Sequence, residues 1–211
     1  MVQRVVAMGN SFVMMVDSGT DLPHEYYEKN DLRLIEMNFV LNGVEYKDDA
    51  GLSMDYKKFY DIIRNGGVSS TSMINVDKYT QEFEKVLAGG EDLLYISMSS
   101  GISGSYNSAR LAAEELSEKY PNRKLRVCDG LIASMGGALL THLALKERAK
   151  GKSIDEVAQW VEDNKLYLNH LFTVDDLMYL QRGGRISKTV AVMGSLIGVK
   201  PMLDVDDKGA L

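Results

Sequence analysis

Short apolar runs alternate with amphipathic segments along the first 165 residues of the chain. Four runs rich in branched and aromatic side chains predict buried strands, at residues 12–17, 32–41, 92–96 and 124–129. Apolar residues at helical spacing predict helices at residues 24–30, 54–64, 77–87, 109–116, 131–149 and 153–168. Alternating strands and helices are typical of a parallel sheet covered on both faces. We therefore predict an α/β fold, with a Rossmann-like parallel-sheet domain over residues 1–165.

Polar residues mark where two of these helices begin and end. Ser53 is placed to cap the helix that follows it, and Asn65-Gly66-Gly67 is expected to end that helix. Ser153 and Glu156 have the spacing of a capping box at the start of the last helix. These signals set the expected element boundaries.

Three loops made of small polar residues fall at or near the ends of predicted strands. They are SGTD at 18–21, VSSTS at 68–72 and the serine-glycine turn SMSSGISGSYNSAR at 97–110. In parallel sheets, ligands bind beyond the carboxyl ends of the strands. We therefore expect the three loops to converge at one edge of the sheet and to form a binding site there.

The pattern changes near residue 169. A short strand, a compact helix and a glycine-rich basic turn are predicted over residues 169–188, followed by a small apolar helix, a strand and a turn. We interpret residues 166–211 as the start of a second, smaller α/β domain that is incomplete at residue 211. The chain is accordingly expected to be truncated or to continue further.

Composition and charge exclude several classes of protein. The formal net charge of −6, without a stripe of lysine and arginine, argues against a broad nucleic-acid-binding face. One cysteine, Cys128, cannot form an intramolecular disulfide or a cysteine-based metal cluster, and we expect it to be a small buried residue at a strand end. No signal peptide is recognised and no apolar segment is long enough to insert stably in a membrane, so the cytoplasm is the expected location.

The loops offer little for catalysis. The nearest match to the nucleophile elbow of esterases, Gly101 to Ser105, has serine in place of the last glycine, and the three histidines lie outside triad spacing. A serine hydrolase with Ser103 as nucleophile remains the alternative function, and a nucleotide-binding module is a third possibility. The phosphate-loop and dinucleotide fingerprints are absent, and no metal-ligand spacing is present. We assign no catalytic and no metal-binding residues.

Hydrogen-bond donors are the chemistry that the loops do supply. Ser100, Ser103 and the amides near Gly104 stand at a predicted helix N-terminus, where an anion is favoured. Thr71 and Ser72 add two hydroxyls from another loop. Two or three charge-assisted hydrogen bonds, worth about 1.5–3 kcal/mol each, can hold one carboxylate. Simple helix capping is the alternative role for any single serine.

Four motifs in a fixed order carry a family resemblance. They are VDSGTDLP at 16–23, VSSTS at 68–72, SSGISGSYNSA at 99–109 and YLQRGGRIS at 179–187. With these motifs the chain resembles the DegV family of bacterial fatty-acid-binding proteins, which serve as the lipid-binding subunit of fatty acid kinase. The resemblance implies a non-catalytic carrier that needs no cofactor. Such a carrier holds a long-chain fatty acid while a separate kinase subunit phosphorylates its carboxylate.

The resemblance also implies roles for individual residues. It places the head-group contacts at Thr71 and Ser103, and it places Arg185 near the same site. An ion pair across the domain junction is the alternative role for Arg185. The family usually continues the Thr-Ser motif with Gln-Pro-Ser, whereas this chain has Met73-Ile74-Asn75. That departure keeps the hydroxyls but changes the loop that carries them.

The resemblance implies that the acyl chain lies between the two domains, where a long tail needs a dry tunnel. Burial is worth about 0.8 kcal/mol for each methylene, so a tail of some fifteen methylenes contributes roughly 12 kcal/mol before ordering costs. Ordinary core packing is the alternative role for each candidate wall residue. The candidates are Ile132, Leu139, Leu140, Leu143, Val192, Met193, Leu196 and Ile197.

Overall fold

The computed structural model describes residues 12–188 and 200–211, and it confirms the predicted α/β class. In chain order the elements are β1 (Val13–Asp17), the 3-10 turn η1 (Ser18–Thr20), α1 (His24–Asn30), β2 (Leu32–Ile35), β3 (Asn38–Leu41), β4 (Val44–Lys47), α2 (Tyr56–Arg64), β5 (Ser69–Thr71), α3 (Val76–Ala88), β6 (Leu93–Ser97), α4 (Ser105–Lys119), β7 (Leu125–Asp129), α5 (Ser134–Ala149), α6 (Ile154–Asn164), the 3-10 turn η2 (Lys165–Tyr167) and α7 (Leu177–Arg182). The second-domain helix predicted after residue 188, with Val192, Met193, Leu196 and Ile197, lies outside the described residues.

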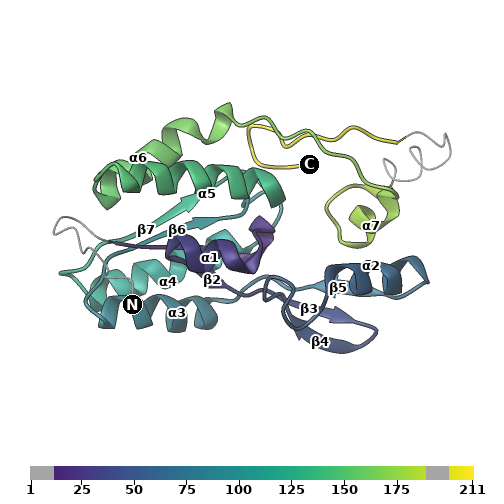
Figure 1. Ribbon diagram of the computed structural model, residues 1–211, viewed down its shortest axis with the longest axis horizontal. Helices are drawn as coiled ribbons and strands as arrows, with labels where there is room; N and C mark the ends of the chain where they lie inside the picture. Colours follow the sequence, from purple (N-terminus) through teal and green to yellow (C-terminus); the bar gives the residue numbers. More distant parts are fainter. Residues whose placement is uncertain (1–11, 189–199) are drawn as a thin grey trace.

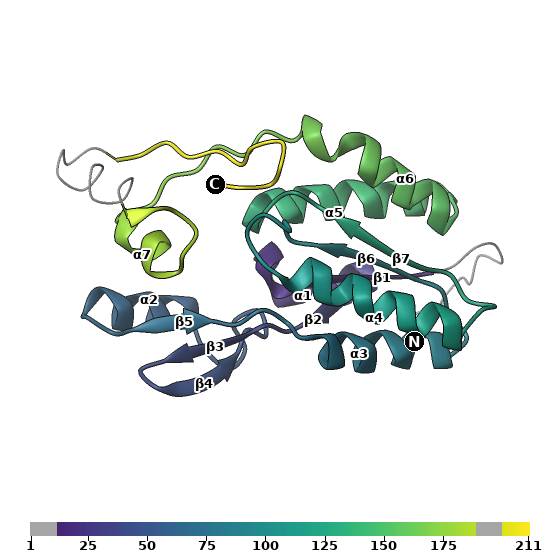
Figure 2. The ribbon, with the colours of Figure 1, turned by 180° about the vertical axis from the view of Figure 1, so that it is seen from behind.

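The larger sheet has four parallel strands in the order β2-β1-β6-β7. Helices α1, α5 and α6 cover one face, and α3 and α4 cover the other (Figures 1 and 2). Side chains alternate between the two faces as the pleat requires. On β1, Met14 and Val16 enter the core beneath α5 and α6, whereas Val13 and Met15 face α3 and α4.

The predicted strand over residues 32–41 is in fact two strands in two different sheets. Its first part, β2, pairs with β1, while its second part, β3, pairs antiparallel with both β4 and β5. Between them the Met37 amide donates to the Ser18 hydroxyl at 3.1 Å, and the Met37 carbonyl accepts from the Asp48 amide at 2.9 Å. The chain therefore leaves the large sheet at residues 36–37.

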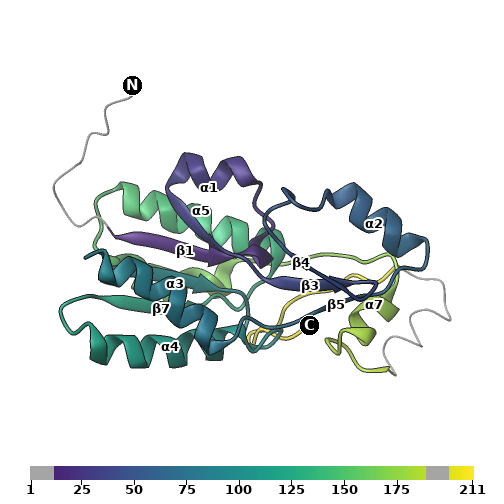
Figure 3. The ribbon, with the colours of Figure 1, turned by 90° about the horizontal axis from the view of Figure 1, so that it is seen from below.

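The small sheet has the order β4-β3-β5 and lies at one end of the molecule together with α2 and α7 (Figure 3). The loop predicted at 68–72 was an incorrect interpretation, because residues 69–71 form the edge strand β5. The Ser53 cap was also incorrect. The carboxylate of Asp55 caps α2 by accepting from the Lys58 amide at 2.9 Å. The domain boundary near residue 165 stays a prediction.

Several local predictions are confirmed. The Ser153 side chain and the Glu156 side chain form the predicted capping box at the start of α6. Cys128 is buried on β7, and burial raises the pKa of its thiol to about 12. Ile132 and Leu140 pack in the core beneath α5 and α6, which is the alternative role left open for them as tunnel-wall candidates.

Candidate functional site

The serine-glycine turn after β6 is held mostly by its own backbone. The Ser99 carbonyl accepts from the Ile102 amide at 3.1 Å and from the Ser103 amide at 3.0 Å. The Ser99 hydroxyl accepts from the Gly101 amide at 3.0 Å and donates to the Gly209 carbonyl at 2.6 Å. The C-terminal turn thus closes directly on this loop, and the loop leads into α4.

Two hydroxyls at the start of α4 connect the turn to the chain beyond β5. The Ser103 hydroxyl lies 3.0 Å from the Ser105 hydroxyl and accepts from the Ser105 amide at 3.2 Å. The Ser105 hydroxyl accepts from the Ile74 amide at 3.1 Å. The sulfur of Met73 covers Gly104, where an added Cβ would come within 2.6 Å of it. Residues 73–74 therefore pack against residues 104–105, two positions after Thr71.

Thr71 lines a cavity of about 190 Å³ on the small sheet. The aromatic side chains of Phe39, Tyr56, Phe59 and Tyr60 form much of its wall. Phe39 faces Thr71 across the β3–β5 pair and contacts Phe59 edge-on at 5.3 Å between ring centroids. The cavity therefore offers apolar surface next to the Thr71 position.

Acidic side chains line another part of the same cavity. Burial raises the pKa of Asp48 against the lowering effect of the Ser18 side chain, and the nearby charges of Asp21 and Asp49 raise it further. Burial likewise raises the pKa of Asp21. An anionic group placed beside these carboxylates would be repelled, so this part of the cavity does not suit a carboxylate head group.

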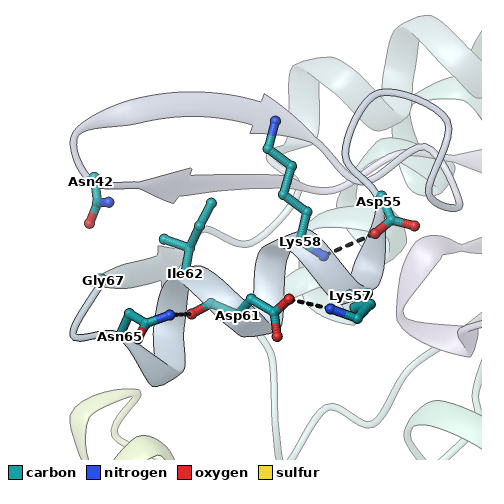
Figure 4. A pocket seen from close by; sticks show the side chains of 8 residues that line it. All are labelled: Asn42, Asp55, Lys57, Lys58, Asp61, Ile62, Asn65 and Gly67. Atoms are coloured by element: carbon teal, nitrogen blue, oxygen red, sulfur yellow. Dashed lines mark hydrogen bonds and ion pairs between the residues drawn. The ribbon is translucent and has the colours of Figure 1, made fainter.

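A second, wider cavity lies beside α2 and has a volume of about 490 Å³ (Figure 4). Several of its charged groups already have partners. The Lys57 ammonium lies 2.6 Å from the Asp61 carboxylate, and Asp55 caps the helix. None of the residues predicted to bind a ligand lines it, so we do not assign it a function.

The remaining predicted residues lie in the serine-glycine turn, against it, or just beyond β5. The Arg185 guanidinium donates from Nε to the Ile102 carbonyl at 3.1 Å, next to Ser103 in the chain. Ser100 is exposed, and its amide donates to Asp129 at 3.1 Å at the end of β7. Ser72 is exposed beyond β5, with its amide 3.5 Å from the Asn38 carbonyl. The ligand-binding roles of all these residues, and both roles considered for Arg185, stay predictions.

The structure shows three buried polar side chains whose hydrogen bonds the sequence analysis did not predict. Asp17 at the end of β1 is fully buried and accepts from the Tyr95 hydroxyl at 2.8 Å, and Tyr95 lies 2.7 Å from the Tyr79 hydroxyl. Both tyrosines lie within the apolar patterns that predict a helix at 77–87 and a strand at 92–96. The sequence gives only a weak indication of these bonds, namely that a tyrosine in a buried segment needs a hydrogen-bond partner for its hydroxyl.

The hydrolase alternative gains no support from the described contacts. The His142 ring bonds the Tyr26 hydroxyl at 2.6 Å, His24 lies 3.6 Å from Glu28, and His170 packs against Gly136. None of these contacts joins a histidine to Ser103. Within residues 12–188 and 200–211, no group of three or more histidine, cysteine or acidic side chains is arranged to hold a metal ion. The described helices also include none with the length and apolar character of a membrane span.

Comparisons with known proteins agree with the motifs. The family model described as an uncharacterised protein of the DegV family matches residues 11–211. A DegV domain-containing protein from Clostridium perfringens is 42% identical over 200 residues, which are 95% of this chain and 69% of the relative.

Two solved structures share the fold. One is a stearic-acid-binding protein from Eubacterium ventriosum, with a TM-score of 0.81 and 27% identity over 94% of this chain and 68% of that one. The other is a fatty-acid-binding DegV family protein from Thermus thermophilus, with a TM-score of 0.78 and 26% identity over 94% of this chain and 69% of that one. The family match and the 42% identical relative together establish that the chain belongs to the DegV family.

Proposed function

We propose that this protein binds a long-chain fatty acid without altering it chemically, and that Thr71 and Ser103 hold the carboxylate. The observation that carries this proposal is the contact between two separate loops. The Ile74 amide bonds the Ser105 hydroxyl, and Met73 covers Gly104, so the segment that follows Thr71 is fixed against the turn that carries Ser103. The fatty acids bound by the Eubacterium and Thermus proteins support the same ligand class.

The distribution of charged groups favours a head group beside the serine-glycine turn over one beside Asp21 and Asp48. The carboxylates of Asp21 and Asp48 repel an anion from their part of the cavity. The serine-glycine turn instead offers a helix N-terminus, hydroxyls and the nearby Arg185 guanidinium. Charge-assisted hydrogen bonds there contribute about 1.5–3 kcal/mol each.

The tail would supply most of the binding free energy. Each buried methylene contributes about 0.8 kcal/mol, so a long acyl chain outweighs two or three head-group hydrogen bonds. The aromatic wall of the 190 Å³ cavity is where the tail would begin. A carrier that encloses the tail and leaves the carboxylate near the surface can present that carboxylate to a separate kinase subunit, which is the partner we propose.

The head-group assignment is tested with alanine substitutions. Thr71→Ala and Ser103→Ala should each weaken binding of a defined fatty acid about tenfold, the equivalent of about 1.4 kcal/mol, with the fold retained by circular dichroism. Ser117→Ala is the matched control, because its hydroxyl bonds the Ala113 carbonyl further along α4. Unchanged affinity in both single variants and in the double variant would contradict the assignment.

The ligand class and the lack of catalysis need separate measurements. Native mass spectrometry of protein purified from cells should show an added mass in the fatty-acid range. A fluorophosphonate probe should leave the serines unlabelled, whereas stoichiometric labelling of Ser103 would favour a hydrolase. Phosphorylation of the bound acid only in the presence of an added kinase subunit would support the proposed partner.

A further inference from the structure

A small cavity lies at the carboxyl end of the large sheet, between η1, the end of β6 and the first turns of α5. Thr20 of η1, Ile96 of β6, and Gly137 and Thr141 of α5 are among the residues that line it, and all four are buried. Its volume is about 10 Å³. A cavity of this size has the space that one water molecule needs. We call it the Thr141 cavity.

The Thr141 hydroxyl is a buried polar group without a partner in the described part of the protein. Thr141 lies in the second turn of α5 and is 0% exposed, and its Oγ1 atom makes no hydrogen bond to any residue of the ranges 12–188 and 200–211. A threonine within a helix often donates to the carbonyl four residues earlier, but the bond to the Gly137 carbonyl is not formed here. An unbonded buried hydroxyl is destabilising, and folded proteins seldom keep one.

The end of β6 presents a second unbonded hydroxyl, which faces the opposite side of the sheet. Leu94 and Ile96 pack beneath α5 and α6, whereas Leu93 and Tyr95 face α3 and α4. Ser97 is next in this alternation, so its side chain points toward α3 and α4. Its hydroxyl also lacks a partner among the described residues, and the residue is 2% exposed. Ser97 therefore borders the Thr141 cavity with its main chain.

Thr20 offers the Thr141 cavity an acceptor from η1. Its hydroxyl donates to the Asp17 carbonyl at 3.1 Å and lies 3.1 Å from the Tyr27 hydroxyl, which must then be the donor of that pair. A hydroxyl oxygen has two lone pairs, so one acceptor position remains on Thr20. Thr20 faces α5 closely, because a Cβ added to Gly137 would lie 3.4 Å from the Cγ2 atom of Thr20.

We propose that the Thr141 cavity binds one water molecule, which accepts a hydrogen bond from the Thr141 hydroxyl and donates one to the Thr20 hydroxyl. Two such bonds are within the two to four that buried waters make. The water satisfies the buried hydroxyl of α5 and joins this helix to η1, the first of the three polar loops at the edge of the sheet. The inference goes beyond fatty acid binding and does not depend on it, because no ligand is needed at Ser103.

Three variants separate the hydroxyl from the rest of the side chain. Thr141→Val replaces the hydroxyl with a methyl group of similar size, so the water loses its donor. Thr141→Ser keeps the hydroxyl and loses only a methyl group, so it should retain the water. Ser97→Ala is the matched control, because it removes a buried, unbonded hydroxyl that faces the other side of the sheet.

Magnetic relaxation dispersion of the water signal counts the internal waters that exchange slowly with solvent. We expect Thr141→Val to hold one such water fewer than the parent protein. Thr141→Ser and Ser97→Ala should hold the same number as the parent. An equal count in the parent and Thr141→Val proteins would overturn the proposal, and loss of a water from Ser97→Ala instead would overturn its placement at Thr141.

The sign of the stability change gives an independent readout. If the Thr141 hydroxyl is bonded to a water, Thr141→Val removes a satisfied hydrogen bond, and the equilibrium constant for urea unfolding should rise about fivefold, the equivalent of about 1 kcal/mol. If the hydroxyl has no partner, valine removes an unfavourable buried group, and the same constant should fall. A fall would contradict the proposal.

The proposal stays testable if Thr141→Val does not fold. A crystal structure of the parent protein must then show one water within hydrogen-bonding distance of both Thr141 Oγ1 and Thr20 Oγ1. A cavity without solvent density, or a Thr141 hydroxyl turned to the Gly137 carbonyl, would show that no water is bound there.

Discussion

Gly101 provides a sharp test of how the C-terminal turn is attached to the candidate site. A Cβ at this position would lie 2.6 Å from both the carbonyl carbon and the carbonyl oxygen of Gly209, and 2.8 Å from the Ala210 nitrogen. All three are backbone atoms, so no side chain can move aside. Gly101→Ala must therefore push residues 206–210 away from the serine-glycine turn.

The expected loss of free energy for attachment of the turn follows from the contacts that Gly101→Ala would break. The Ser99 hydroxyl bond to the Gly209 carbonyl, 2.6 Å long, contributes about 1 kcal/mol. Overpacking costs about 1–3 kcal/mol more. The free energy of detaching the turn should fall by about 2–4 kcal/mol, which is about 30- to 1,000-fold in the opening equilibrium. The large parallel sheet does not contact this turn through Gly101, so global unfolding should change little.

Hydrogen exchange followed by mass spectrometry measures the effect. Amides of residues 206–210 should exchange faster in Gly101→Ala, while amides of β1 and β6 keep the parental rate. Gly104→Ala is the matched control, because its Cβ would meet only the Met73 sulfur, at the end of a flexible exposed side chain. Equal protection of the C-terminal turn in the Gly101→Ala and parent proteins would refute the argument.

Two further predictions concern titrating groups. Burial raises the pKa of the Cys128 thiol to about 12, so the thiolate fraction at pH 8 is about 10⁻⁴. Labelling of Cys128 with Ellman's reagent should therefore be about 10³-fold slower in the native protein than in the guanidinium-unfolded protein. Comparable rates would show that the thiol is accessible. Hydrogen bonds from Lys150, the larger effect, and from Lys152 lower the pKa of Glu147 in the folded protein. The contribution of Glu147 to stability is therefore present above its unfolded pKa of about 4.3, and it is lost as pH falls through its pKa in the folded protein. Glu147→Gln should accordingly show a shallower loss of urea-unfolding free energy from pH 5 to 3, and an unchanged slope would contradict the assignment.

The sequence predicts the large sheet well and the small sheet poorly, for a physical reason. Strands β1 and β6 are buried on both faces, so they appear as continuous apolar runs that few other structures could accommodate. Strand β5 consists of Ser69, Ser70 and Thr71, and it is a strand because β3 offers it a free edge. Its own side chains do not specify that pairing, and the residues look like a loop.

The candidate site, too, could be predicted from the sequence only in part. Hydroxyl-rich composition was sufficient to locate the serine-glycine turn, because few other roles require so many small donors at a helix N-terminus. It was not sufficient to rank the serines. Ser105 was not singled out, although its hydroxyl is the one that bonds the Ile74 amide. That contact joins positions 31 residues apart in the sequence, and no local pattern predicts it.

The departure from the family's Gln-Pro-Ser after the Thr-Ser motif acquires a physical meaning in this fold. A proline at position 74 has no N–H, so it could not make the Ile74 bond to Ser105, whose oxygen would then accept from Ser103 alone. Ile74 also places its side chain in the core beside α3, where it is 5% exposed. Asn75 caps α3 by accepting from the Lys78 amide at 2.9 Å, a role that serine can also fill. The replacement therefore preserves the helix start and adds a hydrogen bond that joins the segment after β5 to Ser105, the first residue of α4.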